Sequence, residues 1–159
     1  MNSTTLQALR RLLFFTQAEA AALVGGVSER AWIHWESGTR PVPQDVDSRM
    51  QELAAWRENA VINAGDAIAC AAKELPDGAE FEPPALVWYA SVEDWMTLPG
   101  REPLLWRPQC SAIAHLCATH GCVAVKFDGP IYAQWLRASG HQDSEQTRCM
   151  WAADHMPRS

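Results

Sequence analysis

The chain has 159 residues, a mass of 17.6 kDa and 48% hydrophobic residues, enough to bury the core of one domain or of two small ones. This composition excludes a disordered tail, and the net charge of −6 excludes a polybasic nucleic-acid coat. A single basic face remains compatible with this charge.

The hydrophobic segments and the cysteines both bear on where the protein is located. The apolar stretch at 12–15 is too short for a membrane span or for the core of a signal peptide. The five cysteines form no C-x-x-C pair, and their odd number is typical of reduced thiols. We therefore expect a cytoplasmic protein.

The first forty residues predict short helices with sharp ends. Thr4 and Gln7 form a capping-box pattern, which opens a helix with leucines along one side. Thr16 and Glu19 form a second capping box. It opens a short alanine-rich helix that ends at Gly25 and the glycine after it.

Two further helices are predicted before the character of the sequence changes. Ser28 caps a helix over residues 29–37, which Gly38 ends. Pro43 begins a long helical segment that runs to about residue 75, and residues 63–65 mark a place where it kinks or ends.

The second half of the chain predicts alternating strands and helices after an acidic, proline-bearing linker. In chain order these are a strand at 86–89, a short helix from Ser91, a strand at 104–106, a helix at 109–120, a strand at 122–127 and a helix at 131–138. The fold class is therefore α+β. The expected domains are an all-α bundle with its long connecting helix at 1–75, the linker at 76–84, a small α+β domain at 85–139 and a polar, partly loose tail at 140–159.

Two short helices joined by a glycine turn are the layout of a helix-turn-helix, whose second helix enters the major groove of DNA. The helix at 29–37 has two faces when its residues are placed at about 100° intervals. Trp32 and Trp35 need a core on one side, whereas Arg30 and His34 lie on the other. This arrangement favours a recognition helix.

The outward face of this helix combines side chains that can read base edges. The helix dipole disfavours a cation in the first turn, so Arg30 is unfavourable at its position in the free protein. Contact with DNA would explain why an arginine is found there. Its guanidinium suits guanine, His34 can donate to a base or phosphate, Ile33 can contact a thymine methyl and Glu29 can accept from cytosine. A solvated helix face is the alternative, and for Glu29 the helix N-terminus alone is a sufficient reason.

Hydroxyl, amide and cationic groups that can hold phosphates flank the motif, namely Thr16, Gln17, Ser28 and Arg40. Residues 1–40 carry four arginines against three glutamates, a net charge of +1, so the rest of the chain carries −7. The part expected to face DNA is therefore the less acidic part.

This pattern resembles the XRE/Cro-type helix-turn-helix regulators over residues 4–43. The resemblance rests on Leu6 and Arg10, on Thr16-Gln17 with Ala21, on Gly25, and on V-S-x-x-x-W-x-x-W-E-S-G from Val27. The sequence is most similar to the anti-CRISPR-associated (Aca) autorepressors and related uncharacterised bacterial proteins. These share the extra turn residue Gly26 and, more weakly at 104–124, a C-terminal α+β dimerisation domain.

The resemblance implies a structure for the motif. Arg10 and Glu36 would form a structural ion pair that joins the first helix to the end of the third. The core of the motif would consist of Ala21, Gly25, Trp32 and Trp35.

The resemblance also implies a function and partners. The chain would be a homodimer that binds an inverted repeat in double-stranded DNA and represses its own anti-CRISPR-type operon, with recognition helices about 34 Å apart. Its own mRNA is a second implied ligand, and no membrane partner is implied. Ile33 departs from the polar residue common in the relatives, which leaves the operator sequence open. The dimer interface is expected to use some of Trp88, Trp95, Trp106 and Trp135.

Other classes of function have less support. His115 and Cys117 invite a zinc site together with His120 and Cys122, but residues 115 and 117 point about 200° apart on a helix, so no metal is expected. Because the sequence lacks a nucleophile motif, a phosphate loop and a dinucleotide fingerprint, we expect no enzyme, no catalytic residues and no cofactor.

Two alternatives remain for the C-terminal half. One is an antitoxin or adaptor whose C-terminal domain binds a partner protein, with DNA binding as secondary autoregulation. The other is a ligand-sensing regulator, although no cluster of convergent polar groups is visible there in the sequence.

Overall fold

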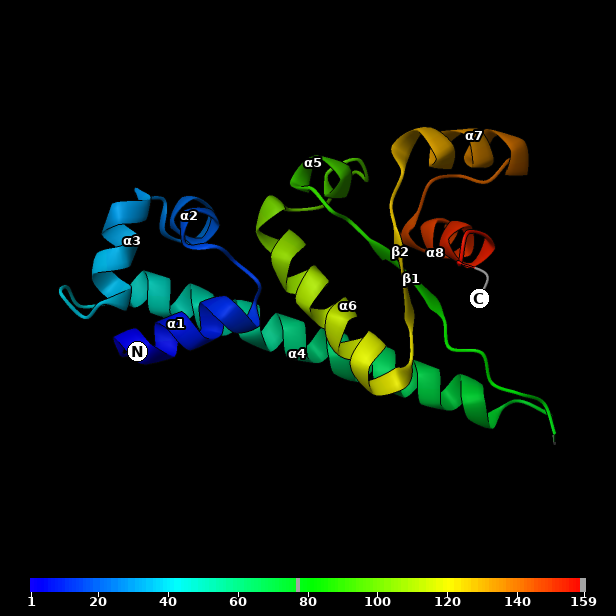
Figure 1. Cartoon of the computed structure of the whole chain (residues 1–159), viewed down its shortest axis with the longest axis horizontal. Coiled ribbons are helices and arrows are strands. Elements are labelled where there is room, and N and C mark those ends of the chain that lie inside the picture. The colour runs from blue at the N-terminus through cyan, green and yellow to red at the C-terminus, as the bar shows by residue number, and fades with distance from the viewer. Residues whose placement is uncertain (77, 158–159) are drawn as a thin grey trace. The chain divides into compact units, whose positions relative to one another are not determined.

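A computed structural model describes residues 1–76 and 78–157, and these form two compact units (Figure 1). Unit 1 is Met1–Ala60 with Pro103–Ala112, and unit 2 is the described part of Val61–Glu102 and Ile113–Ser159. The predicted α+β class is confirmed, because helices accompany one small sheet. Within the described residues, no helix has the length and apolar character needed to cross a membrane.

Unit 1 begins with short helices whose ends follow their capping residues. α1 (Ser3–Leu12) starts earlier than expected, because the Asn2 side chain accepts the Thr5 backbone N–H at 2.8 Å. Thr16 and Glu19 form the complete capping box of α2 (Gln17–Ala20). A π-helical segment (Ala21–Gly25) follows, and α3 (Glu29–Glu36) begins after Ser28.

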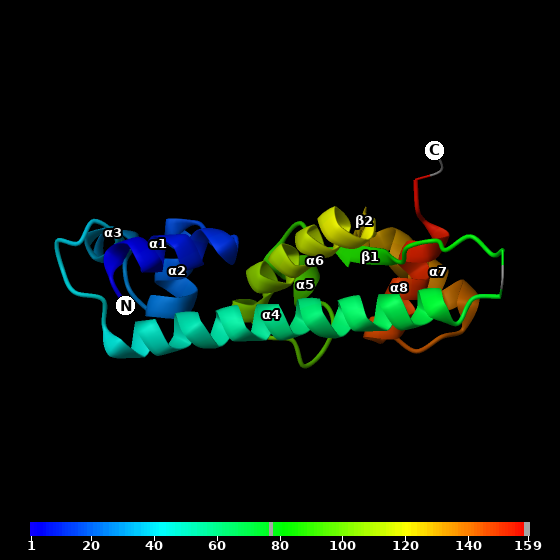
Figure 2. The same ribbon diagram turned by 90° about the horizontal axis from the view of Figure 1, so that it is seen from below.

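The core of unit 1 lies between these helices and the first part of α4 (Gln44–Lys73). Figure 2 shows α1, α2 and α3 along one side of the N-terminal half of α4. α4 runs without interruption through residues 63–65, where alanine-rich neighbours offset the low helix propensity of Gly65. The core consists of Leu6, Leu13, Phe15, Ala20, Ala21, Val24, Trp32, Trp35, Val46, Met50 and Leu53.

Unit 2 contains a parallel two-stranded sheet of β1 (Ala85–Trp88) and β2 (Val123–Lys126), paired from Ala85↔Val123 to Trp88↔Lys126. The chain between the strands contains α5 (Val92–Trp95), a 3₁₀ turn (Pro103–Leu105) and α6 (Trp106–His120). After β2 the chain forms α7 (Gly129–Ser139) and α8 (Glu145–Asp154), and α8 packs against β1.

The strand predicted at 104–106 is wrong. Pro103–Leu105 is a 3₁₀ turn that leads directly into α6, so this helix begins three residues before the predicted start. A short apolar run does not distinguish strand from helix by itself. Here Pro103 and Pro108 decide the outcome, because proline favours the first turn of a helix, where its missing N–H is not needed.

The expectation of a partly loose tail is wrong for residues 145–154. They form α8, which buries Thr147, Arg148, Trp151 and Ala152 on one side. Ser144 caps this helix by accepting the Thr147 backbone N–H at 3.1 Å. The turn predicted at 76–78 includes Asp77, which lies outside the described residues, as do residues 158–159.

Candidate nucleic-acid interface

A single buried carboxylate holds the helices of the predicted motif together. Glu36 accepts from Arg10 Nε at 2.5 Å and from Arg10 Nη2 at 3.1 Å, and its side chain is only 3% exposed. The Gln17 amide donates to it at 2.9 Å and the Trp32 indole at 2.8 Å. Arg10 also donates to the carbonyl of Phe15 at 2.9 Å. These bonds join α1, α2 and α3, and thereby fix the orientation of α3.

The same contacts control the charge of Glu36. Burial raises the pKa of this carboxyl, but the hydrogen bonds from Arg10, Trp32 and Gln17 outweigh burial and hold the pKa below its usual value. Ionised Glu36 therefore stabilises the folded state above the ordinary carboxyl pKa. This stabilisation is lost as the pH falls through the lowered value.

We expect acid to remove this contribution, worth about 1.5–3 kcal/mol, the size of hydrogen bonds to a charged group. Urea unfolding followed between pH 7 and about pH 2 measures it. Glu19 and Asp143 also have a lowered pKa, so the wild type has several acid-sensitive groups. Glu36→Gln is the control, because it is less stable at pH 7 but loses less on acidification. An unchanged acid dependence in Glu36→Gln would contradict this role.

α3 presents two different faces. On the inner face Trp32 is fully buried and Trp35 is 8% exposed, with their rings 5.6 Å apart in an edge-to-face arrangement. Gly25 permits this packing. A Cβ at Gly25 would lie 3.0 Å from Val27 Cγ2 and 3.2 Å from the Trp35 ring. The glycine turn therefore determines how closely α3 approaches the rest of the motif.

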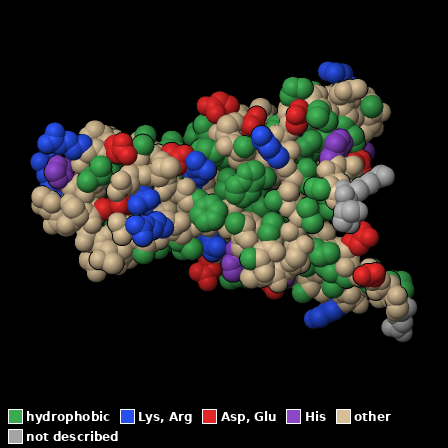
Figure 3. All heavy atoms as spheres, viewed as in Figure 1, with side chains coloured by type: hydrophobic (Ala, Val, Ile, Leu, Met, Phe, Trp, Pro, Cys, Tyr) green, Lys and Arg blue, Asp and Glu red, His purple; other side chains and the backbone are tan. Residues whose placement is uncertain are grey.

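The outer face of α3 carries the predicted base-reading residues. Glu29, Arg30 and Ile33 are exposed and His34 is half-buried. Figure 3 shows basic side chains together with a histidine gathered over the start of α3. Among the residues that the structure describes, none pairs with the Arg30 or Arg40 guanidinium. Both cations are thus available on this surface.

The four predicted phosphate-binding residues differ in their exposure and in the hydrogen bonds that they already make. Thr16, Ser28 and Arg40 are exposed, although the two hydroxyls already accept backbone N–H groups as helix caps. Gln17 is half-buried and turns inward to Glu36. One signal for this inner network was present in the sequence. Trp32 and Glu36 are four residues apart on one helix and therefore face the same side.

The cysteine and histidine side chains that the structure describes in unit 2 lie too far apart to form a shared metal site. Within residues 1–76 and 78–157, no group of three or more His, Cys, Asp or Glu side chains is placed to hold a metal ion. Burial raises the pKa of the Cys117 and Cys122 thiols, which disfavours the thiolate that zinc requires.

Comparison with known proteins identifies a family and a relative. A profile of the family described as Aca2/YdiL-like matches residues 1–125. A protein named Aca2 repressor, from Pectobacterium phage ZF40, is 37% identical over 122 residues, which is 76% of this chain and 96% of that relative. The family profile includes all of α1, α2 and α3 and ends at β2 (Val123–Lys126).

Proposed function

The chain belongs to the Aca2/YdiL-like family, and from this premise we propose that it is a sequence-specific DNA-binding transcriptional repressor. The observation that carries the proposal is the two-faced α3. Its tryptophans are buried on one side, and an unpaired, exposed Arg30 lies on the other. The ion pair of Arg10 with Glu36 holds this helix in place, which makes its outer face a rigid reading surface.

Each exposed residue of this face has a chemical role in the proposal. Arg30 donates two hydrogen bonds to guanine in the major groove, and His34 donates to a base or a phosphate one turn further on. Ile33 is 41% exposed, which suits contact with a thymine methyl rather than packing in the core. Glu29 accepts from a cytosine amine.

Phosphate contacts orient the head on the duplex. In the proposal these come from the start of α2 at Thr16 and Gln17, from Ser28 at the start of α3 and from Arg40 after its end. Gln17 retains one amide N–H for this purpose after its bond to Glu36.

We propose that two copies act together on an inverted repeat, with α3 of each copy in successive major grooves about 34 Å apart. Of the four tryptophans considered for the dimer interface, Trp95 and Trp106 are buried within one copy. Trp88 and Trp135 are only half-buried, and they remain for the interface in the proposal. The regulated genes are the chain's own anti-CRISPR-type operon, with its own mRNA as a second ligand.

Replacing Arg30 with alanine is expected to leave the fold intact and to weaken operator binding by roughly 1–3 kcal/mol per half-site. The measurement is a gel-shift titration on the DNA upstream of the chain's own gene, at two salt concentrations and with competitor DNA. Arg137→Ala is the matched control. It removes the same charge from an exposed position on α7 and is expected to bind as the wild type does.

The outcomes separate the proposal from its alternative. A salt-sensitive shift that resists competitor DNA, and that Arg30→Ala loses, supports a repressor with α3 as its reading helix. Wild-type affinity in Arg30→Ala would overturn the assignment of α3. No specific shift with the wild type would favour an adaptor that binds a partner protein, and labelled leader transcript in the same gel tests the mRNA.

A further inference from the structure

The start of α6 belongs to unit 1, although it follows β1 and α5 in the chain. Unit 1 includes Pro103–Ala112, which contains the 3₁₀ turn and the first part of α6. This turn contacts the π-helical segment between α2 and α3. Its Leu104 and Leu105 pack against the core that α1, α2 and α3 share with α4. The helices that carry the proposed DNA contacts are therefore completed by a segment from the second half of the chain.

Ser111 fixes α6 to two other helices of unit 1. Its side chain is buried, and its hydroxyl donates to the carbonyl of Leu12, at the end of α1, at 2.5 Å. The same oxygen accepts from Arg57 Nε, on α4, at 2.7 Å. Arg107 lies four residues before Ser111, which is about one helical turn, so both side chains project from the same side of α6. Arg107 is thereby directed at unit 1.

Arg107 forms an ion pair with Glu19 of α2. Its Nη2 donates to Glu19 Oε1 at 2.6 Å, and its Nε lies 3.1 Å from both carboxylate oxygens. The two side chains are 25% and 23% exposed, so the pair lies near the surface of unit 1 rather than in its core. The guanidinium also lies 4.0 Å from the centre of the Trp106 ring, which is buried. Arg107 is therefore held in one place beside Glu19.

Glu19 places a negative charge beside the proposed phosphate contacts of α2. Its Oε2 accepts the Thr16 backbone N–H at 2.9 Å, and Gln17 is the next residue along the chain. Burial raises the pKa of Glu19, but the hydrogen bonds from Arg107 and Thr16 outweigh burial and lower the pKa, so the carboxylate is ionised at neutral pH. Charges interact through water within a Debye length of roughly 8–10 Å. An unpaired Glu19 would therefore repel a DNA phosphate bound at Thr16 or Gln17.

We propose that Arg107 is a positioning residue for DNA binding, which acts by neutralising Glu19 beside Thr16 and Gln17. The inference rests on the proposed function, because it needs α2 to face the phosphate backbone. The guanidinium holds the Glu19 side chain in place and keeps the pair without net charge where a phosphate approaches. Because phosphates carry no sequence information, Arg107 raises the affinity for operator and non-operator DNA alike, in contrast to Arg30.

Three variants of the full-length chain test the charge of this pair. Arg107→Ala leaves the pair with a net charge of −1, Glu19→Gln leaves it with +1, and the double variant returns it to zero. Glutamine also fits the third position of a capping box, so Glu19→Gln retains the cap of α2. Gel-shift titrations on the upstream DNA, at about 50 mM and about 300 mM salt, measure the affinities. Urea unfolding of each variant shows whether it is folded.

The two single variants are expected to change the affinity in opposite directions. Arg107→Ala is expected to weaken binding about threefold per half-site, the size of one exposed charge interaction, and Glu19→Gln to strengthen it by a similar factor. The double variant is expected to bind as the wild type does. Both differences are expected to narrow at the higher salt, where the charges are screened. A pair that only held α6 in place would make both single variants weaker at either salt.

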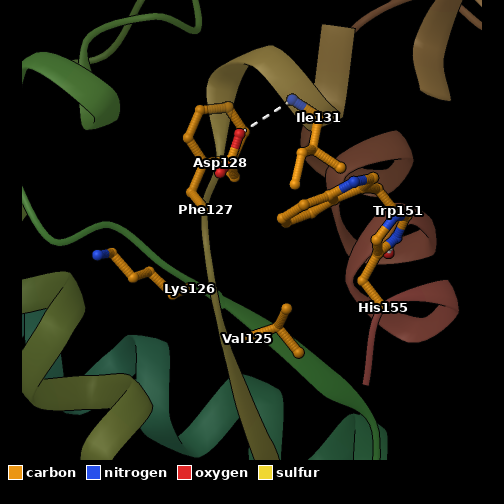
Figure 4. A pocket seen from close by; sticks show the side chains of 7 residues that line it. All are labelled: Val125, Lys126, Phe127, Asp128, Ile131, Trp151 and His155. Carbon is orange, nitrogen blue, oxygen red and sulfur yellow. Dashed lines mark hydrogen bonds between the residues drawn. The ribbon is translucent and has the colours of Figure 1, made fainter. Parts of the chain in front are cut away.

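Two control variants separate the local charge from other effects. Arg107→Lys keeps the positive charge, and is expected to bind much more tightly than Arg107→Ala. Lys126→Ala removes one positive charge from unit 2 and is expected to bind as the wild type does. Lys126 is exposed on β2, and its side chain extends away from the other residues drawn in Figure 4. If Arg107→Ala fails to fold, Glu19→Gln and Arg107→Lys still decide the question.

The outcomes distinguish this inference from the proposed function. No specific shift with the wild type would overturn both. A specific wild-type shift with unchanged affinity in Arg107→Ala would overturn the role of Arg107 alone. Weaker binding by Glu19→Gln would show that the pair is only a structural contact. A loss in Lys126→Ala equal to that in Arg107→Ala would attribute the effect to the net charge of the whole chain.

Discussion

Trp32→Ala is expected to lower the free energy of unfolding of unit 1 by about 3–5 kcal/mol, the cost of removing a large aromatic ring from a packed core. Trp32 is fully buried, and its ring packs edge-to-face on Trp35. Its indole N–H also donates to Glu36, so the change removes packing and one bond of the Glu36 network together. Urea unfolding followed by circular dichroism measures the loss.

Two control variants separate the contributions of Trp32. Trp32→Phe keeps most of the ring but removes the bond to Glu36, and it is expected to cost clearly less than alanine. Ile33→Ala changes the adjacent residue on the exposed face, and it is expected to alter stability by no more than about 0.5 kcal/mol. If the midpoint for Trp32→Ala equalled that of the wild type, the tryptophan could not be in the core.

The sequence allowed the short helices of unit 1 and the glycine turn before α3 to be predicted, because their signals are local. Capping residues lie within three positions of the groups that they cap, as Thr16 and Glu19 do. The turn needed a residue without a side chain, because a Cβ at Gly25 would lie 3.2 Å from the Trp35 ring. Helical periodicity alone then assigned Trp32 to the inside and Arg30 to the outside.

The features that the sequence did not predict depend on partners far along the chain. Gln17 lies at a helix start, and its sequence neighbours do not show that its amide donates to Glu36, nineteen residues away. α8 appears polar, because its buried stripe contains Thr147 and Arg148 beside Trp151. Nothing in residues 140–159 alone indicates that β1 covers this stripe. Arginine is rarely buried unless it is paired, so burial of Arg148 can be predicted only when its partners are known.

These partners make Arg148→Ala a strongly destabilising change in unit 2, with an expected loss of about 3–5 kcal/mol, because it removes a fully buried side chain together with its hydrogen bonds to Asp143 and Thr97. Arg148 is 1% exposed and pairs with Asp143 through Nε at 2.9 Å and Nη2 at 2.8 Å. It also donates to Thr97 Oγ1 at 3.0 Å, and its guanidinium lies 4.9 Å from the centre of the Phe127 ring. Hydrogen exchange of the α8 amides, together with a denaturant midpoint, measures the loss.

The design of the control follows from the different burial of the two charges. The Asp143 side chain is 29% exposed against 2% for Arg148, so water can solvate the carboxylate when the arginine is absent but not the reverse. Arg148→Met retains much of the buried stem, and is therefore expected to cost less than Arg148→Ala. Asp143→Asn with Arg148→Met is expected to cost less than the two single changes added together, because the pair is lost once. Strict additivity would show that the ion pair does not hold α8. Wild-type exchange rates in Arg148→Ala would show that α8 is held by Trp151 and its aromatic neighbours alone.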